Sequence, residues 1–360
     1  MQLQRKALNY SGENIYVGID VHKKSWRISL MTDVLELKGF SMASDPAGLV
    51  SYLHHHYPGA TYYSVYEAGF CGVWIHNHLV EAGVKNIVVN PSDVPSSGKE
   101  RERKTDAVDA SKLARSLRAG ELEPIYIHQQ KSFHDRSLMR LRSSSVKRMT
   151  QLKNQIKGML NFYGIKIPLE LESSSKSWSG RFISWLTDEV LPGGVIAQTA
   201  FGFLLEEYTS KRKQMTVILG QIRLLCRTET YKSNMEWLRK VPGIGLCSGM
   251  HLLVNIEDIN RFANRDKFAG YMGFVPTCHS TGDKESGGQI TPRAPKELRS
   301  ILIECAWVAI RCDPALTLKY SEFRKRMDEN KAIVRIARKL CNRIYYVLKY
   351  KREYVNGLLQ

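Results

Sequence analysis

The chain has 360 residues, 43% of them hydrophobic, and a formal net charge of +18 at pH 7. This length allows two or three domains with a real core, and the charge predicts a polyanionic partner, nucleic acid first and an anionic membrane surface second. No stretch approaches the ~18 apolar residues of a membrane-spanning helix, no signal-like core follows the N-terminal residues, and the seven scattered cysteines include no Cys-x-x-Cys pair, so we expect a cytoplasmic protein with no membrane span, disulfide framework or zinc knuckle.

Three strands are predicted first. Residues 15–20 are typical of a buried strand that ends in the carboxylate of Asp20. Residues 26–30 follow a polar turn, and residues 34–40 complete a three-stranded meander. A helix is then predicted over residues 45–57.

Strands and helices alternate after that helix. Residues 62–67 form a predicted strand that ends in Glu67, residues 73–82 a helix and residues 85–90 a strand. A basic, polar run then leads into a helix that opens at Lys104-Thr105-Asp106-Ala107-Val108-Asp109-Ala110. This order of elements is that of an RNase H-like α/β domain, and in open α/β sheets functional sites gather at strand ends.

Four acids fall at the ends of these elements. Asp106 and Asp109 are three residues apart, so on a helix they share a face and repel one another. Alone, this spacing is more often a solvated helix start near the positive end of the helix dipole. Together with Asp20 and Glu67, in a chain of charge +18, it favours a site in which two Mg²⁺ ions roughly 3.5–4 Å apart serve phosphodiester chemistry.

The middle of the chain is predicted to be helical and basic. A long helix spans residues 135–164, a Ser-rich break covers 173–177, and helices follow over 181–186 and 197–229. The two long helices indicate an antiparallel coiled-coil hairpin, or arms that pair between subunits. Their basic residues form either a solvated face or a surface that meets phosphates.

The C-terminal part combines a glycine turn, a polar loop and two helices. Residues 241–245 read Val-Pro-Gly-Ile-Gly, which indicates a helix-hairpin-helix that grips a DNA backbone or a simple helix–helix turn. Residues 277–291 form a Gly/Ser/Thr-rich loop, which is a connector or a place for a nucleophile. Helices are predicted over residues 298–311 and, rich in Lys and Arg, over 319–351.

Several of these motifs occur together in one known family. They are Tyr16-Val17-Gly18-Ile19-Asp20, Tyr66-Glu67-Ala68-Gly69, Lys104-Thr105-Asp106-Ala107-Val108-Asp109-Ala110, Val241-Pro242-Gly243-Ile244-Gly245 and Ser280-Thr281-Gly282. In this order, and over nearly the whole chain, the sequence resembles the IS110/IS1111-type transposases, which are Piv-like DEDD recombinases. Each motif is weak alone, and the combination is specific.

The resemblance implies three domains and an activity. A RuvC-like, RNase H-like catalytic domain would span residues 1–130, a helical coiled-coil region 131–232, and a mainly α-helical C-terminal transposase domain with a helix-hairpin-helix and serine loop 233–360. It implies Mg²⁺, two ions with Mn²⁺ as a substitute, held by four ligands: Asp20, Glu67, Asp106 and Asp109. It also implies a serine that attacks DNA, donor and target double-stranded DNA, a structured guide RNA (bridge RNA) that selects them, and a homodimer or homotetramer.

The sequence departs from the family pattern in two places. The serine of the family stands directly before the loop glycine or one residue earlier, and those positions hold Thr281 and Ser280. Ser280 is the preferred nucleophile because a primary hydroxyl is less hindered, with Thr281 next and Ser286 a distant third. The Lys and Gly that the family often has before Leu298-Arg299 are absent, and Arg293 or Lys296 could replace that lysine.

The resemblance therefore implies an RNA-guided insertion-sequence transposase that cuts and rejoins DNA. Two alternatives are a RuvC-like Holliday-junction nuclease, which needs the acids and not the serine, and a nucleic-acid-binding protein without catalysis. The histidines at 54–56, 76 and 78 are expected to be structural or surface residues.

Overall fold

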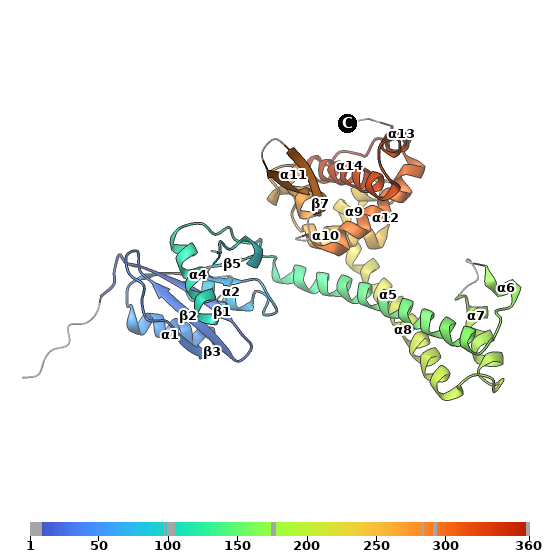
Figure 1. Cartoon of the computed structure of the whole chain (residues 1–360), viewed down its shortest axis with the longest axis horizontal. Coiled ribbons are helices and arrows are strands. Elements are labelled where there is room, and N and C mark those ends of the chain that lie inside the picture. Colours follow the sequence, from blue (N-terminus) through green and yellow to red (C-terminus); the bar gives the residue numbers. More distant parts are fainter. Residues whose placement is uncertain are drawn as a thin grey trace, which may run out of the picture. The chain divides into compact units, whose positions relative to one another are not determined.

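The computed structural model describes residues 9–96, 98, 105–173, 178–281, 284–290 and 294–357. The chain divides into two compact units, Met1–Ile127 and His128–Gln360 (Figure 1). The boundary predicted near residue 232 between a helical middle and a C-terminal domain stays a prediction. Across the described ranges, no helix is both long enough and apolar enough to cross a bilayer.

The first unit is built on a five-stranded sheet. The strands are β1 (Asn14–Val21), β2 (Ser25–Met31), β3 (Phe40–Ala43), β4 (Thr61–Glu67) and β5 (Lys85–Val89), and they lie in the order β3-β2-β1-β4-β5. The first three strands pair antiparallel, whereas β1, β4 and β5 run parallel. The antiparallel pairing of the first three strands, the positions of β1 and β2, and the two later strands are confirmed as predicted.

The third strand begins later than predicted. It was expected over residues 34–40, but β3 starts at Phe40. Residues 32–39 instead form a loop, closed by a bridge between Met31 and Glu36. Val34 and Leu35 are exposed on that loop, so the alternation of apolar and polar residues over 35–38 gave a false strand signal.

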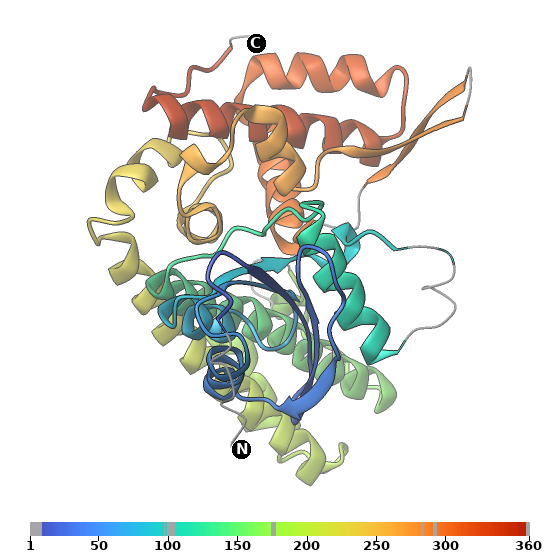
Figure 2. The same ribbon diagram turned by 90° about the vertical axis from the view of Figure 1, so that its left-hand side faces the viewer.

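Helices cover both faces of this sheet (Figure 2). Helices α1 (Pro46–His56) and α2 (Trp74–Glu81) bury Leu49, Leu53, Ile75 and Leu79 against one face, in a core that includes Ile15, Val17 and Ile19 of β1. Helix α4 (Asp106–Arg118) covers the other face, where Leu113 packs against Val65 and Val89. A short 3-10 helix, η1 (Pro91–Asp93), follows β5.

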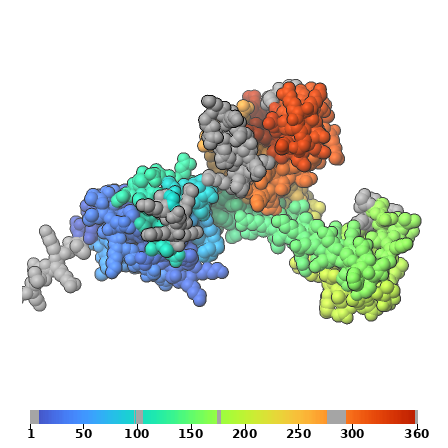
Figure 3. All heavy atoms as spheres, viewed as in Figure 1, coloured from blue at the N-terminus to red at the C-terminus, as the bar shows by residue number. Residues whose placement is uncertain are grey.

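The second unit begins with a long helical hairpin. Helices α5 (Gln130–Phe162) and α8 (Gln198–Cys226) pack side by side in opposite directions, because Met139 shares a core with Ile222 while Leu160 shares one with Phe201. Between them lie α6 (Leu169–Glu172), α7 (Gly180–Trp185) and the π-helix η2 (Leu186–Val190). The far end of the hairpin is a packed lobe of green and yellow-green atoms in Figure 3.

The rest of the second unit shares one hydrophobic core. It contains α9 (Lys232–Leu238), α10 (Leu246–Ile256), η3 (Ile259–Arg261), α11 (Arg265–Tyr271), α12 (Lys296–Cys312), α13 (Pro314–Arg324) and α14 (Glu329–Tyr350). The helix–turn–helix predicted around residues 241–245 is confirmed as α9 and α10.

The single basic helix predicted over residues 319–351 was wrong, because the chain forms two helices there. Helix α13 ends at Arg324 and α14 begins at Glu329. Asp328 stands between them as the N-cap of α14, and its carboxylate accepts hydrogen bonds from the backbone N–H groups of Asn330 and Lys331. Aspartate is a common N-cap residue, so Asp328 is a signal for the start of a helix. The run of basic residues on both sides of Asp328 made this signal easy to miss.

The polar loop predicted over residues 277–291 is mostly a β-hairpin. Strands β6 (Pro276–Thr281) and β7 (Lys284–Ile290) pair antiparallel, with Ser280 opposite Glu285. Glycine and hydroxyl residues are typical of loops, but pairing between two such segments still satisfies their backbone groups. The segment predicted to be a loop therefore forms two paired strands. Residues 282 and 283 lie outside the described ranges.

Asp313 is a fully buried acid in the second unit and connects three elements. Its carboxylate caps α13 by accepting from the N–H of Ala315, pairs with the Arg343 guanidinium at 2.5 Å, and accepts hydrogen bonds from the Tyr354 hydroxyl and the Gly357 N–H. Burial alone would raise the pKa of Asp313, but these donors together lower the pKa below its usual value.

Stability should therefore fall in acid through Asp313. The folded-state pKa lies below the unfolded value of about 3.9, so the stabilisation is complete above that pH and is lost as the pH falls through the folded pKa. Asp313→Asn should lower the free energy of unfolding at pH 7 by roughly 3–5 kcal/mol, because Arg343 loses its buried partner. It should also flatten the pH dependence, measured by urea unfolding between pH 3 and 7. The exposed Asp188→Asn is the control, and equal slopes for wild type and Asp313→Asn would contradict the assignment.

Candidate metal centre

Two of the predicted acids stand side by side at the end of the sheet. The parallel register of β1 and β4 pairs Gly18 with Val65 and Ile19 with Tyr66, so Asp20 and Glu67 are the next residues on each strand. Residues that face each other in parallel strands point to the same side of the sheet. This side is the one that α4 covers, because Val65, two residues before Glu67, packs against Leu113 of α4. Both carboxylates are partly exposed, at 22% and 34%.

The other two acids stand in the first turn of α4. Thr105 caps this helix with its hydroxyl, which accepts from the N–H of Val108 at 3.4 Å. Asp106 and Asp109 follow the cap, where the helix dipole favours negative charge. Cap and dipole therefore support two carboxylates that would otherwise repel each other.

Gly18 determines how closely α4 approaches the sheet. A Cβ atom at Gly18 would lie 2.0 Å from the carbonyl oxygen of Ala110 and 2.5 Å from the nitrogen of Ala114. Both are backbone atoms of α4, so no side-chain rearrangement could make room. The missing side chain thus allows the helix backbone to lie directly on β1, two residues before Asp20, and this contact brings the helix acids to the strand acids.

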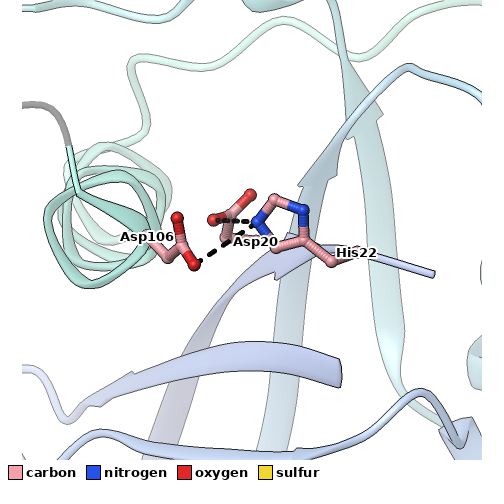
Figure 4. Close-up of side chains that lie close together, drawn as sticks. All are labelled: Asp20, His22 and Asp106. Carbon is pink, nitrogen blue, oxygen red and sulfur yellow. Dashed lines mark ion pairs between the residues drawn. The ribbon is translucent and has the colours of Figure 1, made fainter. Parts of the chain in front are cut away.

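A histidine joins one pair of these acids. His22 Nε2 lies 3.2 Å from Asp20 Oδ2 and 3.5 Å from Asp106 Oδ2 (Figure 4). The three side chains each offer one potential ligand atom, and these atoms lie within 4.8 Å of one another. Two carboxylate oxygens and one imidazole nitrogen form a donor set that fits a divalent cation.

A lysine joins the other pair. Lys112 Nζ lies 3.4 Å from Asp109 Oδ1 and 3.8 Å from Glu67 Oε1. Its side chain is only 12% exposed, less than either acid. Lysine is rarely buried to this degree without a partner, and here the two carboxylates supply one.

The electrostatics of Asp20 reflect this convergence. Burial is the largest cause that raises the pKa of Asp20, and the negative charges of Asp106 and Asp109 raise it further, while His22 opposes them. The charges of both helix acids therefore act on Asp20. Lys112 lies between Asp109 and Glu67 and contacts both. The four predicted acids are thus linked in two pairs through His22 and Lys112. A divalent cation would relieve the repulsion from Asp106 and Asp109 that adds to the effect of burial on Asp20.

Comparison with known proteins identifies the family. The DEDD transposase model of the IS110 group matches residues 17–165, and a second model, described as the transposase IS116/IS110/IS902 family, matches residues 235–321. The chain belongs to the IS110 family of transposases. In this IS110-family protein, residues 17–165 contain all four acids with His22 and Lys112. Residues 235–321 contain the glycine turn and Ser280.

Individual relatives agree with this assignment. The transposase-like y4qE protein of Sinorhizobium fredii is 28% identical over 248 residues, which are 68% of this chain and 58% of that relative. The transposase of the insertion sequence element IS1111A from Coxiella burnetii is 23% identical over 76% of this chain and 74% of its own length. The transposase of IS1533 from Leptospira borgpetersenii is 22% identical over 81% of this chain and 84% of its own length. Membership in the DEDD family implies use of a divalent metal in general terms.

Sequence reasoning missed the two basic residues of this site in the IS110-family chain. His22 follows Asp20 by two positions, and strand alternation puts such residues on the same face. Lys112 follows Asp109 by three, the spacing of neighbours on a helix. Both signals were available, but a polar turn after a strand and a lysine within a helix are common surface features. His76 Nδ1, by contrast, donates to Asn86 Oδ1 at 2.8 Å, and His54, His55 and His56 are exposed, as expected of structural or surface residues.

The predicted nucleophiles lie in the other unit. Ser280 and Thr281 stand on β6 and Ser286 on β7, and the placement of their side chains is outside the described part of the chain. Lys104, Gly282 and Arg293 also fall outside the described residues, whereas Lys296 begins α12. The meeting of a serine with the acids thus stays a prediction.

Filling the space at Gly18 should disrupt the metal centre. Gly18→Ala would place a methyl group against the α4 backbone, and we expect it to lower the free energy of unfolding by about 1–3 kcal/mol, as overpacking of a close contact does. It should also weaken Mn²⁺ binding, because the helix that carries Asp106 and Asp109 must move. Calorimetric unfolding and Mn²⁺ titration measure the two effects.

The matched control for this substitution is Gly69→Ala. Gly69 lies in the same unit, and the nearest atom to a Cβ there is 3.9 Å away, an ordinary contact. Unchanged stability and Mn²⁺ affinity in Gly18→Ala would show that the contact does not position the site.

Proposed function

We propose that this chain is a DNA transposase that cuts and rejoins DNA by metal-dependent phosphoryl transfer. The observation that supports it most directly is the convergence of Asp20, Glu67, Asp106 and Asp109 at one end of the sheet, together with family membership. Phosphoryl transfer requires charge neutralisation and positioning more than covalent chemistry by the protein, and a cluster of carboxylates suits that requirement.

The first unit is inferred to be RNase H-like, in the RuvC-like form. Its strand order β3-β2-β1-β4-β5, with an antiparallel meander followed by parallel β4 and β5, supports this inference. So does the position of the acids at the ends of β1 and β4 and on the last helix of the unit. The helical hairpin of α5 and α8 is proposed to act as a coiled coil that contacts a second subunit.

Two Mg²⁺ ions, or Mn²⁺, are the proposed cofactors. When bound, such ions activate the attacking hydroxyl and stabilise the leaving oxygen. Asp20, Asp106, Glu67 and Asp109 would supply oxygen ligands, and His22 would add a nitrogen ligand beside Asp20 and Asp106. A nitrogen ligand suits Mn²⁺ better than Mg²⁺, which favours a full set of oxygens.

Ser280 is proposed as the nucleophile, with Thr281 as the second choice. Its hydroxyl oxygen would form a bond to phosphorus while the bond from phosphorus to the leaving deoxyribose oxygen breaks, and the proton of the hydroxyl passes to a nearby base. A free serine hydroxyl is a poor nucleophile at neutral pH, so it needs a base that accepts its proton. The paired strands β6 and β7 give the serine a backbone fixed by its partner Glu285.

The turn between α9 and α10 is proposed to hold the DNA backbone. Gly243 has a φ of +84°, a conformation that glycine adopts easily. Gly245 is the N-cap of α10, so the first N–H groups of that helix are available for a phosphate. The net charge of +18 favours a polyanionic partner. The guide RNA and an oligomer are proposed as further partners on the strength of the family resemblance.

Removal of the serine hydroxyl tests the mechanism. Ser280→Ala should still bind DNA but form no covalent protein–DNA adduct, assayed by denaturing electrophoresis of the protein with labelled DNA of the element's ends and its co-purified RNA. Thr281→Val is the matched control and should keep the adduct. Full recombination by Ser280→Ala would exclude the serine, and adduct loss in Thr281→Val alone would move the role to Thr281. Continued strand cleavage without an adduct would instead favour a junction nuclease.

Neutralising one acid tests the metal requirement. Asp106→Asn should reduce metal-dependent cleavage by more than the roughly 10–100-fold that even outer partners of metal ligands contribute, with little loss of stability because a repulsive charge is removed. Glu81→Gln, at the end of α2 on the opposite face, is the control. Cleavage rates at several Mn²⁺ concentrations measure the effect, and unaltered rates in Asp106→Asn would contradict the proposed site.

A further inference from the structure

The four acids divide into two pairs, and each pair has one basic side chain between its members. His22 lies between Asp20 and Asp106, and Lys112 lies between Glu67 and Asp109. The two basic groups differ in what they can become when a metal ion arrives. A neutral imidazole has a lone pair and can ligate the ion, whereas an ammonium group has three N–H donors and no lone pair.

Lys112 therefore competes with a cation, while His22 can join one. The ammonium nitrogen stands 3.4 Å from Asp109 Oδ1 and 3.8 Å from Glu67 Oε1, so it lies against the oxygens that a second ion would use. At 12% exposure it has little solvent to turn into without leaving the pair. A unit charge this close to a divalent ion is strongly repulsive where water is partly excluded.

We propose that the Lys112 ammonium occupies the second cation position in the free protein, so that only the Asp20–His22–Asp106 half binds a divalent ion. This inference rests on the proposed function, since it needs the acids to be a metal site. A second ion enters the Glu67–Asp109 half only after the ammonium moves. Lys112 is thus a positioning residue that sets the number of ions bound, not a ligand.

The pairing also explains why these acids tolerate one another. Glu67 and Asp109 would repel across the strand–helix contact that Gly18 makes so close. The single positive charge of Lys112 offsets that repulsion from within the fold, as a bound ion would. Replacing Lys112 by an uncharged side chain should therefore leave a vacancy that a divalent ion fills.

Counting bound ions tests the proposal in the full chain without nucleic acid. Isothermal titration with Mn²⁺, checked by electron paramagnetic resonance of free Mn²⁺, should give one tight site in wild type and two in Lys112→Met. The second site should tighten by roughly tenfold or more. Lys112→Arg keeps the charge and should retain one site.

Thermal unfolding adds a readout that a purely structural lysine would not alter. Lys112→Met should be less stable than wild type without Mn²⁺, and Mn²⁺ should raise its melting temperature by more than it raises that of wild type. If Lys112→Met does not fold, two variants that keep Lys112 still decide. Asp20→Asn should abolish the tight site, and Glu67→Gln should leave the affinity of that site unchanged.

The outcomes separate this inference from the proposed function. Two tight sites in wild type, or one in Lys112→Met with the same affinity as in wild type, would overturn the role of Lys112 and leave the metal site intact. Absence of Mn²⁺ binding in wild type and in both Lys112 variants would overturn the metal centre itself, and the inference with it.

Discussion

The close contact between β1 and α4 is the constraint on which the acidic site depends. Gly18 has no side chain, and the backbone of α4 at Ala110 and Ala114 fills the space where one would be. Asp20 follows on the strand, and Asp106 and Asp109 precede on the helix. A strand and a helix far apart in the sequence thus place their acids within reach of the same basic side chains, without any loop between them having to be rigid.

Charge balance within this contact is local. Each strand acid is paired with one helix acid through a single basic group, Asp20 with Asp106 through His22 and Glu67 with Asp109 through Lys112. Burial is the main reason that the pKa of Asp20 is raised, and the negative charges of Asp106 and Asp109 add to it while His22 opposes it. The site therefore holds more acidic than basic groups in a small space. A positively charged partner would lower the electrostatic energy of the site.

The four acids were predictable because order and spacing are properties of the chain. Asp20 and Glu67 end apolar strands, and Asp106 and Asp109 follow a Thr cap, so alternation and capping rules apply. Lys112 was not predicted because its role depends on Glu67, 45 positions earlier in the sequence, and only the packing of α4 on the sheet brings the two side chains together. The pairing of β6 with β7 was missed for a similar reason, since residues 277–291 have loop composition and acquire their order from each other.

The glycine turn has a mechanical consequence for the second unit. A Cβ at Gly243 would lie 2.3 Å from the carbonyl oxygen of Cys305, so the turn is seated against the middle of α12. That helix is the next one after the β6–β7 hairpin. The backbones of the turn and of α12 are in direct contact. If the turn moves toward α12, that helix has to move with it. A ligand that displaces the turn would therefore also displace α12, the helix that follows the β6–β7 hairpin in the chain.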